Sequence, residues 1–327
     1  MNTELGELIF TATEDITFSD TTVDADLNYR LRAQGNLVLD GTTTITTDGA
    51  SALRADGSIL IDSLVDLDVL GGNLTLSDFA GSGSAASLNL NGQVEVSGQS
   101  SISVAGDINI PGDLSSGLAV TITGGSNLTL DSGSIFNESN RILIDLAGHL
   151  NVLNGSSISA QGNLLITAGG IITVTDSTLV SHTGNLFLTA LGNINLTDSG
   201  SSVTAVEGSV SLNADNVVAN GSVLADTALA IITAGSVNTG SDSYLEAGTD
   251  LSITAETLSM TGGSQAFEEI LLNTTGAVEL TGAILNALGG FVLNAGTQLD
   301  INGGSLDVGT LATITAGAAD RKSTRLN

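Results

Sequence analysis

Carboxylates, arginines and histidines are the side chains of this sequence whose types and spacing suit ligand binding or catalysis. The densest carboxylate cluster lies in SLVDLDVLGG, which contains Asp62, Asp66 and Asp68. Asp66 and Asp68 alternate with apolar residues, so in a β-strand they share one outward face. Paired carboxylates on one face suit a Ca²⁺ site or the acid pair of a glycosidase. The simpler interpretation, which we favour, is an acidic strand face in contact with water.

Arg30, Arg32 and Arg54 form the main cationic group. Arg30 and Arg32 take alternate positions in one predicted strand, and Arg54 takes the place of Arg32 in the next repeat of the chain. If the repeats stack, Arg54 lies directly on Arg32. This arrangement predicts a patch for an anionic ligand. The alternative is that these arginines form ordinary surface ion pairs with acids such as Asp56. Surface ion pairs contribute little to the stability of a fold.

The two histidines, His149 and His182, fall in different repeats, and the chain has no cysteine. A zinc site needs three or four converging ligands, which this set does not supply. We therefore expect no metal, no cofactor and no catalytic residue in this chain.

The charge of the chain restricts its partners. Seven Lys and Arg residues face 35 Asp and Glu residues, for a net charge of −28. Nucleic-acid binding needs clustered cations on phosphates, so we expect no nucleic-acid partner. The absence of cysteine excludes disulfides. The first residues, MNTELGELIF, lack the basic start and apolar core of a signal peptide.

A short phrase recurs along the chain and determines the predicted fold. GNLLITA at 162–168 returns as GNLFLTA at 184–190 and GSVSLNA at 208–214. Its first, third and fifth positions are apolar or small and its fourth is polar, which is the period of a strand with one buried face. In our alignment the third position is taken by Phe10, Leu31, Leu53, Leu76, Val104, Ile122, Ile144, Ile166, Leu188, Leu212, Ile232, Ile253, Leu272, Leu293 and Ile314.

Two more alternating runs separate successive copies, with Gly, Asn, Asp and Ser between them. Three short strands per repeat predict an all-β, right-handed parallel β-helix, or β-solenoid, of about 15 coils with about 21 residues each. Thr and Asn at the fourth position, such as Thr189 and Asn213, can stack into hydrogen-bonded ladders. FAGSGSAAS (79–87) and PGDLSSG (111–117) interrupt the period and predict protruding loops.

The second position of the phrase points outward, yet it is often apolar in the second half of the chain. The residues assigned to it there are Leu143, Leu165, Phe187, Ile231, Leu271 and Val292. Stacked, they predict an apolar stripe for lateral contact, including self-association, because large exposed apolar surfaces are unusual. The alternative is the ordinary β-propensity of such residues on a face in contact with water.

The last eight residues, DRKSTRLN, differ from everything before them. They hold three of the basic residues and resemble the translation of a sequencing adapter. We therefore divide the chain into a single repeat array at 1–319, a fragment of a larger protein, and an artefactual tail at 320–327.

GNLVLDG, GNLLITA, GNLFLTALGNINLTD and GTDLSITA carry a family resemblance that covers nearly all of 5–319. The chain resembles the repeat region of filamentous-haemagglutinin-type exoproteins of the two-partner secretion pathway. The NPNL-like motifs of that family's secretion domain are absent. The resemblance implies export through an outer-membrane pore, an extracellular location on the surface or in the medium, and adhesion to cells or matrix.

These observations favour a non-enzymatic structural and adhesive shaft that attaches to glycans or proteins of host cells or other surfaces. The alternative is a β-helix that binds or degrades polysaccharides, because many such enzymes have this fold. Such sites usually need a lysine or arginine beside acids that bind Ca²⁺, and Lys322, in the tail, is the only lysine of the chain.

Overall fold

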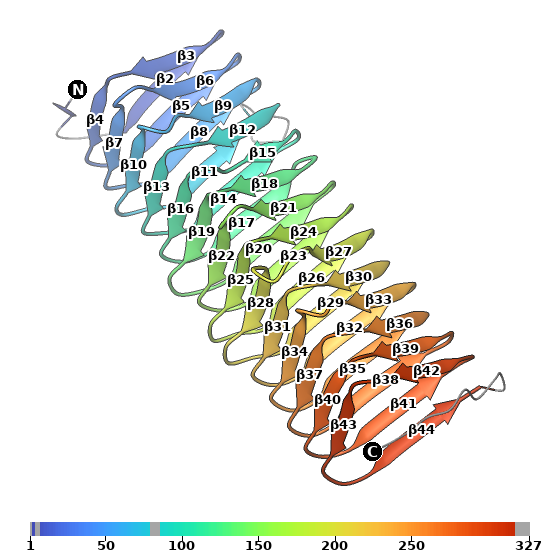
Figure 1. Ribbon diagram of the computed structural model, residues 1–327. Coiled ribbons are helices and arrows are strands. Elements are labelled where there is room, and N and C mark those ends of the chain that lie inside the picture. Colours follow the sequence, from blue (N-terminus) through green and yellow to red (C-terminus); the bar gives the residue numbers. More distant parts are fainter. Residues whose placement is uncertain (1, 4–6, 79–85, 318–327) are drawn as a thin grey trace. The chain divides into compact units, whose positions relative to one another are not determined.

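The computed structural model describes residues 2–3, 7–78 and 86–317, and every regular element in these ranges is a β-strand. The chain divides into two compact units, Met1–Gly169 and Gly170–Asn327, called here the first and second units and described separately. In each unit the chain passes through three strands and returns to the first sheet about 22 residues later. Figure 1 shows this path, in which like strands stack in parallel. The two units contain about 14 turns in total, and the predicted β-solenoid is confirmed.

Three parallel sheets, named A, B and C, make up the first unit. Sheet A contains β1 (Asn2–Thr3), β4 (Thr22–Ala25), β7 (Thr44–Thr47), β10 (Asp66–Val69), β13 (Gln93–Val96), β16 (Asp113–Ser116), β19 (Ser134–Asn137) and β22 (Ser157–Ala160). Sheet B contains β2 (Leu8–Ala12), β5 (Tyr29–Ala33), β8 (Ser51–Ala55), β11 (Leu74–Ser77), β14 (Ser100–Val104), β17 (Val120–Gly124), β20 (Ile142–Leu146) and β23 (Leu164–Ala168). Sheet C contains β3 (Ile16–Ser19), β6 (Leu37–Asp40), β9 (Ser58–Ile61), β12 (Ser87–Leu90), β15 (Ile108–Asn109), β18 (Leu128–Asp131) and β21 (Leu150–Leu153).

The second unit repeats the same three sheets. Its sheet A contains β25 (Thr178–Ser181), β28 (Ser202–Ala205), β31 (Ser222–Ala225), β34 (Tyr244–Ala247), β37 (Gly263–Ala266), β40 (Ile284–Ala287) and β43 (Ser305–Val308). Its sheet B contains β26 (Leu186–Ala190), β29 (Val210–Ala214), β32 (Leu229–Thr233), β35 (Leu251–Ala255), β38 (Ile270–Thr274), β41 (Phe291–Ala295) and β44 (Ala312–Ala316). Its sheet C contains β24 (Ile172–Thr175), β27 (Asn193–Leu196), β30 (Asn216–Ala219), β33 (Ser236–Thr239), β36 (Thr257–Met260), β39 (Val278–Thr281) and β42 (Leu299–Asn302).

The recurring phrase forms sheet B, and its alternation sets the core. In β23, Leu164, Ile166 and Ala168 are buried, whereas Leu165 and Thr167 between them are partly or fully exposed. Ile144 is paired with Ile166 in the first unit, and Leu188 with Leu212 in the second. Each such side chain therefore packs on its counterpart one turn away. Complete burial of a large aliphatic side chain stabilises the fold by about 1.5–3 kcal/mol.

At two copies of the phrase the predicted register is wrong. Ile102, not Val104, pairs with Leu76 and Ile122, although Val104 stays inside because a shift of two residues keeps the face. Ile231, not Ile232, pairs with Leu212, and this shift of one residue exchanges the faces.

The physical reason for the second error lies at the end of β32. Thr233 takes the inward place that alanine fills in most copies, and its hydroxyl donates to the Gly235 carbonyl oxygen at 3.3 Å. Because the hydroxyl has a local acceptor, threonine can occupy a buried position. The run IITA ends in the same letters, ITA, as other copies of the phrase. Alignment on these letters therefore places this copy one residue too far toward the C-terminus.

Asparagine side chains at the corners connect one turn to the next. The Oδ1 atoms of Asn36 and Asn127 accept backbone N–H groups of Ser58 and His149, at 2.9 and 3.0 Å. These bonds satisfy donors at the corners, where the sheet ladder ends. Side-chain ladders occur in sheet C, where the Asn109 amide donates to Asn89 Oδ1 at 2.9 Å. The predicted ladder of Thr189 and Asn213 has no hydrogen bond within the described residues.

Of the two predicted protruding loops, the structure describes PGDLSSG completely and FAGSGSAAS only in small part. PGDLSSG contains β16, which pairs with β13 and β19, so the prediction of a protruding loop is wrong there. Most of FAGSGSAAS, residues 79–85, and the tail at 320–327 lie outside the described residues. Within the described part of the chain, no helix has the length and apolar character needed to cross a membrane.

Candidate functional site

The predicted arginine patch lies on the outward face of sheet B in the first unit. Arg30 and Arg32 occupy the second and fourth positions of β5, and Arg54 occupies the fourth position of β8. Arg32 is paired in register with Arg54, whereas Arg30 is paired with Ala52. Neighbouring strands lie about 4.8 Å apart, so Arg32 and Arg54 are neighbours, as the sequence predicts.

The partners of these arginines differ. The Nε atom of Arg30 lies 2.7 Å from Glu7 Oε1, in an ion pair whose side chains are 41% and 32% exposed. The Nε atoms of Arg32 and Arg54 are covered from solvent and have no hydrogen-bond partner among the described residues. Neither side chain forms an ion pair with a carboxylate of the described residues. Two cationic side chains thus lie side by side, each with an unused donor.

Hydroxyl side chains flank the pair along the same row of sheet B. Thr11 of β2 is paired with Arg32, and Ser77 of β11 is paired with Arg54. Thr11 is exposed, whereas Ser77 is buried and its hydroxyl donates to the Asp78 carbonyl oxygen at 3.2 Å. The row therefore places one exposed hydroxyl-bearing residue, Thr11, next to Arg32.

The acidic cluster lies on sheet A of the same unit. Asp66 and Asp68 share the outward face of β10, as predicted, and Asp68 is paired with Glu95 of β13. Partial burial, and then the charges of Asp66 and Glu95, raise the pKa of the Asp68 carboxyl. Asp62 lies off the strand, and its Oδ1 atom accepts the N–H of Ser63 at 2.7 Å.

Acidic and histidine side chains do not converge on a metal position in the ranges that the structure describes. No group of three or more His, Cys, Asp or Glu residues there is arranged to hold a metal ion. His149 lies at a corner of the first unit and His182 at a corner of the second. The Asp66–Asp68 pair is therefore a crowded acidic face with one close neighbour, Glu95.

The apolar stripe is shorter than predicted. Leu143 is paired with Leu165 in the first unit, and Leu271 with Val292 in the second, with all four side chains outward and half-buried. Ile231 is fully buried, so its assignment to the stripe is wrong. In the second unit, Phe187 is separated from Leu271 along the row by Ser211, Ala230 and Ser252.

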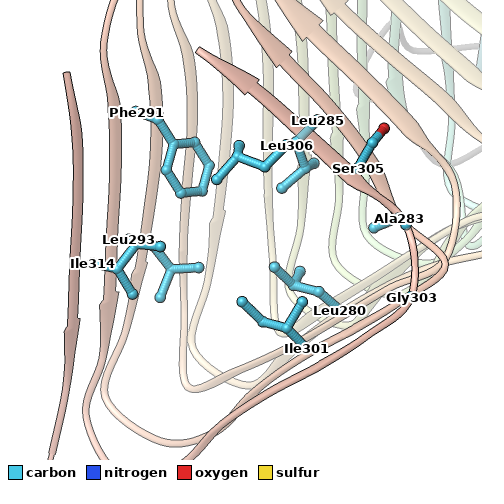
Figure 2. Close-up of a pocket in the computed structure, with 11 residues that line it drawn as sticks. Leu280, Ala283, Leu285, Phe291, Leu293, Ile301, Gly303, Ser305, Leu306 and Ile314 are labelled. Carbon is cyan, nitrogen blue, oxygen red and sulfur yellow. The ribbon is translucent and has the colours of Figure 1, made fainter. Parts of the chain in front are cut away.

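A cavity of about 370 Å³ lies at the last described turn of the second unit. Figure 2 shows that Phe291, Leu293 and Ile314 of sheet B and Leu280 and Ile301 of sheet C point into it. In β41, Phe291 and Leu293 are the inward positions that form the core elsewhere. The cavity is therefore the uncovered end of the aliphatic column rather than a cleft in a sheet face.

A second hollow, of about 380 Å³, lies in the first unit where β10, β13 and β16 of sheet A end. Glu95 and Glu138 line it together with serines and glycine. Sequence reasoning missed this hollow because its residues come from several turns. With two carboxylates in its lining and no cation, it is a poor site for an anion.

The described strands define the class of this molecule as a three-sheet parallel β-solenoid. Comparison of the chain with protein-family models, with curated proteins and with solved structures found no match.

Proposed function

We propose that this chain is a non-enzymatic structural and adhesive segment of a large bacterial exoprotein, secreted or held at the cell surface. The observation that carries the proposal is the repetition of outward-facing side chains, one from each turn. In the second unit, four successive turns of sheet B place Thr254, Asn273, Asn294 and Thr315 in one row. A row of like polar groups can make many weak contacts at once, and linked contacts raise the overall affinity.

The proposed location is extracellular, after export through the outer-membrane pore of a two-partner secretion system. The resemblance of phrases such as GNLLITA to filamentous-haemagglutinin-type repeats supports this route. A chain without cysteine can pass through a pore unfolded without cross-linking. Each turn that folds outside would offer its strand edges to the next turn, because repeats contact mainly their neighbours.

The proposed partners are glycans or proteins of host cells or other surfaces. To test this, the purified chain is coupled to fluorescent microspheres, which are passed over epithelial cell layers and over bare glass under flow. Microspheres that carry succinylated albumin of similar net charge are the reference. We expect several-fold greater retention of the coated microspheres on at least one surface. Retention equal to the reference on every surface would contradict the adhesive role.

A row variant tests the observation that carries the proposal. Replacing Thr254, Asn273 and Asn294 together by alanine removes the polar groups of the row and should lower retention. The matched control replaces Gln265 and Asn286, which form an outward-facing pair on sheet A of the same unit, by alanine. An equal loss of retention in both variants would argue against contact through sheet B.

Binding of polysaccharides is a second candidate function, and one observation favours it. Arg32 and Arg54 lie side by side with unused donors, an arrangement suited to an anionic saccharide. We propose no polysaccharide-cleaving activity.

A further inference from the structure

We propose that Arg32 and Arg54 together bind a single tetrahedral oxyanion, a sulfate or phosphate group carried on an otherwise uncharged ligand. The two side chains occupy the same outward row of sheet B on adjacent strands. This inference deepens the proposed adhesive function, on which its biological meaning rests, by naming the chemical group that one surface recognises.

The charges of Arg32 and Arg54 favour binding of an external anion. Two cationic side chains in register on neighbouring strands repel each other, as like charges on paired positions do. A nearby carboxylate would ordinarily relieve this repulsion, and the chain has 35 acidic residues against seven basic ones. Arg30, two residues from Arg32, has such a partner in Glu7. Arg32 and Arg54 have none among the described residues, so an external anion would supply the missing charge.

The guanidinium groups of Arg32 and Arg54 also have unused donors. Their Nε atoms are covered from solvent and have no acceptor in the described parts of the chain, which is unfavourable for an N–H group. A guanidinium group carries five N–H donors in a planar fork that matches sulfate and phosphate oxygens. Two forks on adjacent strands can donate to different oxygens of one tetrahedral group. An oxyanion on the outward face can therefore accept from the terminal N–H groups of both forks, which are not among the covered atoms.

The surroundings of the two arginines determine which anionic ligands bind best. The exposed hydroxyl of Thr11 extends the row beside Arg32 and offers a neutral contact to the rest of a ligand. The chain as a whole has a net charge of −28, which repels a long polyanion. We therefore expect an ester with one anionic group to bind better, per anionic group, than a polymer with many such groups.

The test uses the full chain and the Nε–Hε signals of its arginines in ¹H–¹⁵N spectra. Inorganic sulfate and inorganic phosphate are titrated separately at constant ionic strength. The signals of Arg32 and Arg54 should shift and saturate, whereas those of Arg30 and Arg141 should not. No saturable shift, or an equal shift at Arg141, would overturn the proposal.

Two esters then distinguish the sources of the oxyanion. Galactose 6-sulfate and glucose 6-phosphate are titrated in the same way, with dextran sulfate as the polyanion. A saturable shift with the first ester supports a sulfated ligand, and a shift with the second supports a phosphorylated one. Failure of both, or tighter binding of dextran sulfate per sulfate group, would contradict the site as described.

Variants provide an independent readout by thermal unfolding in sulfate against chloride at equal ionic strength. R32Q/R54Q should lose the sulfate-specific rise in melting temperature. R32K/R54K keeps the two charges but lacks the planar guanidinium groups, so it should retain only part of that rise. R141Q is the matched control and should behave as the wild type does. An undiminished rise in R32Q/R54Q would overturn the proposal. The microsphere assay is independent of this titration, so failure of one is distinguishable from failure of the other.

Discussion

Tyr29 is a polar exception in the aliphatic core of the first unit. It occupies the first inward position of β5 and is fully buried, and its hydroxyl has no hydrogen-bond partner within the ranges that the structure describes. Its register partner on β8 is the small residue Ser51, which leaves room for the aromatic ring. Burial raises the pKa of the Tyr29 hydroxyl above its ordinary value of 10.0.

We predict that Tyr29→Phe stabilises the chain by about 1 kcal/mol at pH 7, because it removes a buried hydroxyl that has no partner. The gain should grow above pH 10. The folded-state pKa lies above the unfolded one, so the stability that the neutral hydroxyl provides is present below pH 10 and is lost as the pH rises. Urea unfolding at pH 7 and pH 10.5 measures both effects.

Tyr244→Phe is the control for that prediction. Tyr244 is half-exposed, and its hydroxyl donates to Gln265 Oε1 at 3.1 Å. Its replacement should give a smaller change at both pH values. If Tyr29→Phe destabilised the chain, the hydroxyl would have a partner in solution, and the assignment of the buried site would be wrong.

At the residue scale, the sequence predicts on which face of a strand a side chain lies. It predicts less well which other side chains that residue contacts or pairs with. Alternation alone places Arg54 on Arg32 and puts Asp66 beside Asp68. It does not predict that Glu95 crowds Asp68, because that contact depends on the register between turns. Nor does it predict that Arg32 and Arg54 lack acidic partners in the part of the chain that the structure describes, because ion pairing depends on where the long side chains lie.

At the element scale, the strands follow from the period of two, but the corners determine the register. The predicted copies at Leu31, Leu53 and Ile144 are confirmed because the turn lengths around them are regular. The error at Val104 occurs where the lengths of neighbouring turns change, and the error at Ile232 occurs where Thr233 replaces alanine at the end of β32. Close backbone approach and side-chain hydrogen bonds at the corners set those lengths, and the phrase itself contains no information about them.

Gly248 shows how closely the corners pack. A Cβ atom added there would lie 1.7 Å from the carbonyl oxygen of Asp226 in the preceding turn. We predict that Gly248→Ala destabilises the chain by about 1–3 kcal/mol, because the backbone of one turn must move away from the other. Urea unfolding followed by circular dichroism measures the change.

Gly290→Ala is the matched control at a corner of the same unit. The nearest atoms to an added Cβ there are 3.8 Å away, an ordinary contact distance. The substitution should be neutral or slightly stabilising, since alanine restricts the unfolded chain. Equal losses of stability at the two positions would show that the corner contact at Gly248 is not the cause.

At the scale of the whole molecule, each turn contacts mainly its neighbours, so the stability of each unit is expected to be nearly a sum over turns. This is why the repeat alone predicts the β-solenoid. Function is different, because it depends on which side chains occupy the outward rows. The row that contains Thr254 and Asn273 is the basis of the adhesive role that we propose.

We predict that deletion of one complete turn, residues 251–269, leaves a folded chain. The deletion removes β35, β36 and β37 and brings Ile270 to the register of Leu251, opposite Leu229 of β32. Thermal unfolding should stay cooperative, with a modest loss of stability.

Deletion of residues 251–260 is the control, because it removes β35 and β36 but keeps β37. The path through the three sheets is then broken, and the strands that follow meet the wrong sheets. This variant should lose cooperative unfolding. Similar behaviour of the two deletions would contradict the stacking of complete turns.

In each unit, successive turns place aliphatic side chains of sheet B in a dry column, and Ile231 and Ile232 test this most directly. Ile231 is 0% exposed and its neighbour Ile232 is 49% exposed. Thermal unfolding of Ile231→Asp and Ile232→Asp, followed by circular dichroism, compares a buried charge with an exposed one. We predict that Ile231→Asp loses more than about 3 kcal/mol, and that Ile232→Asp changes by less than about 1 kcal/mol. Equal losses, or a greater loss for Ile232→Asp, would contradict the column and its register.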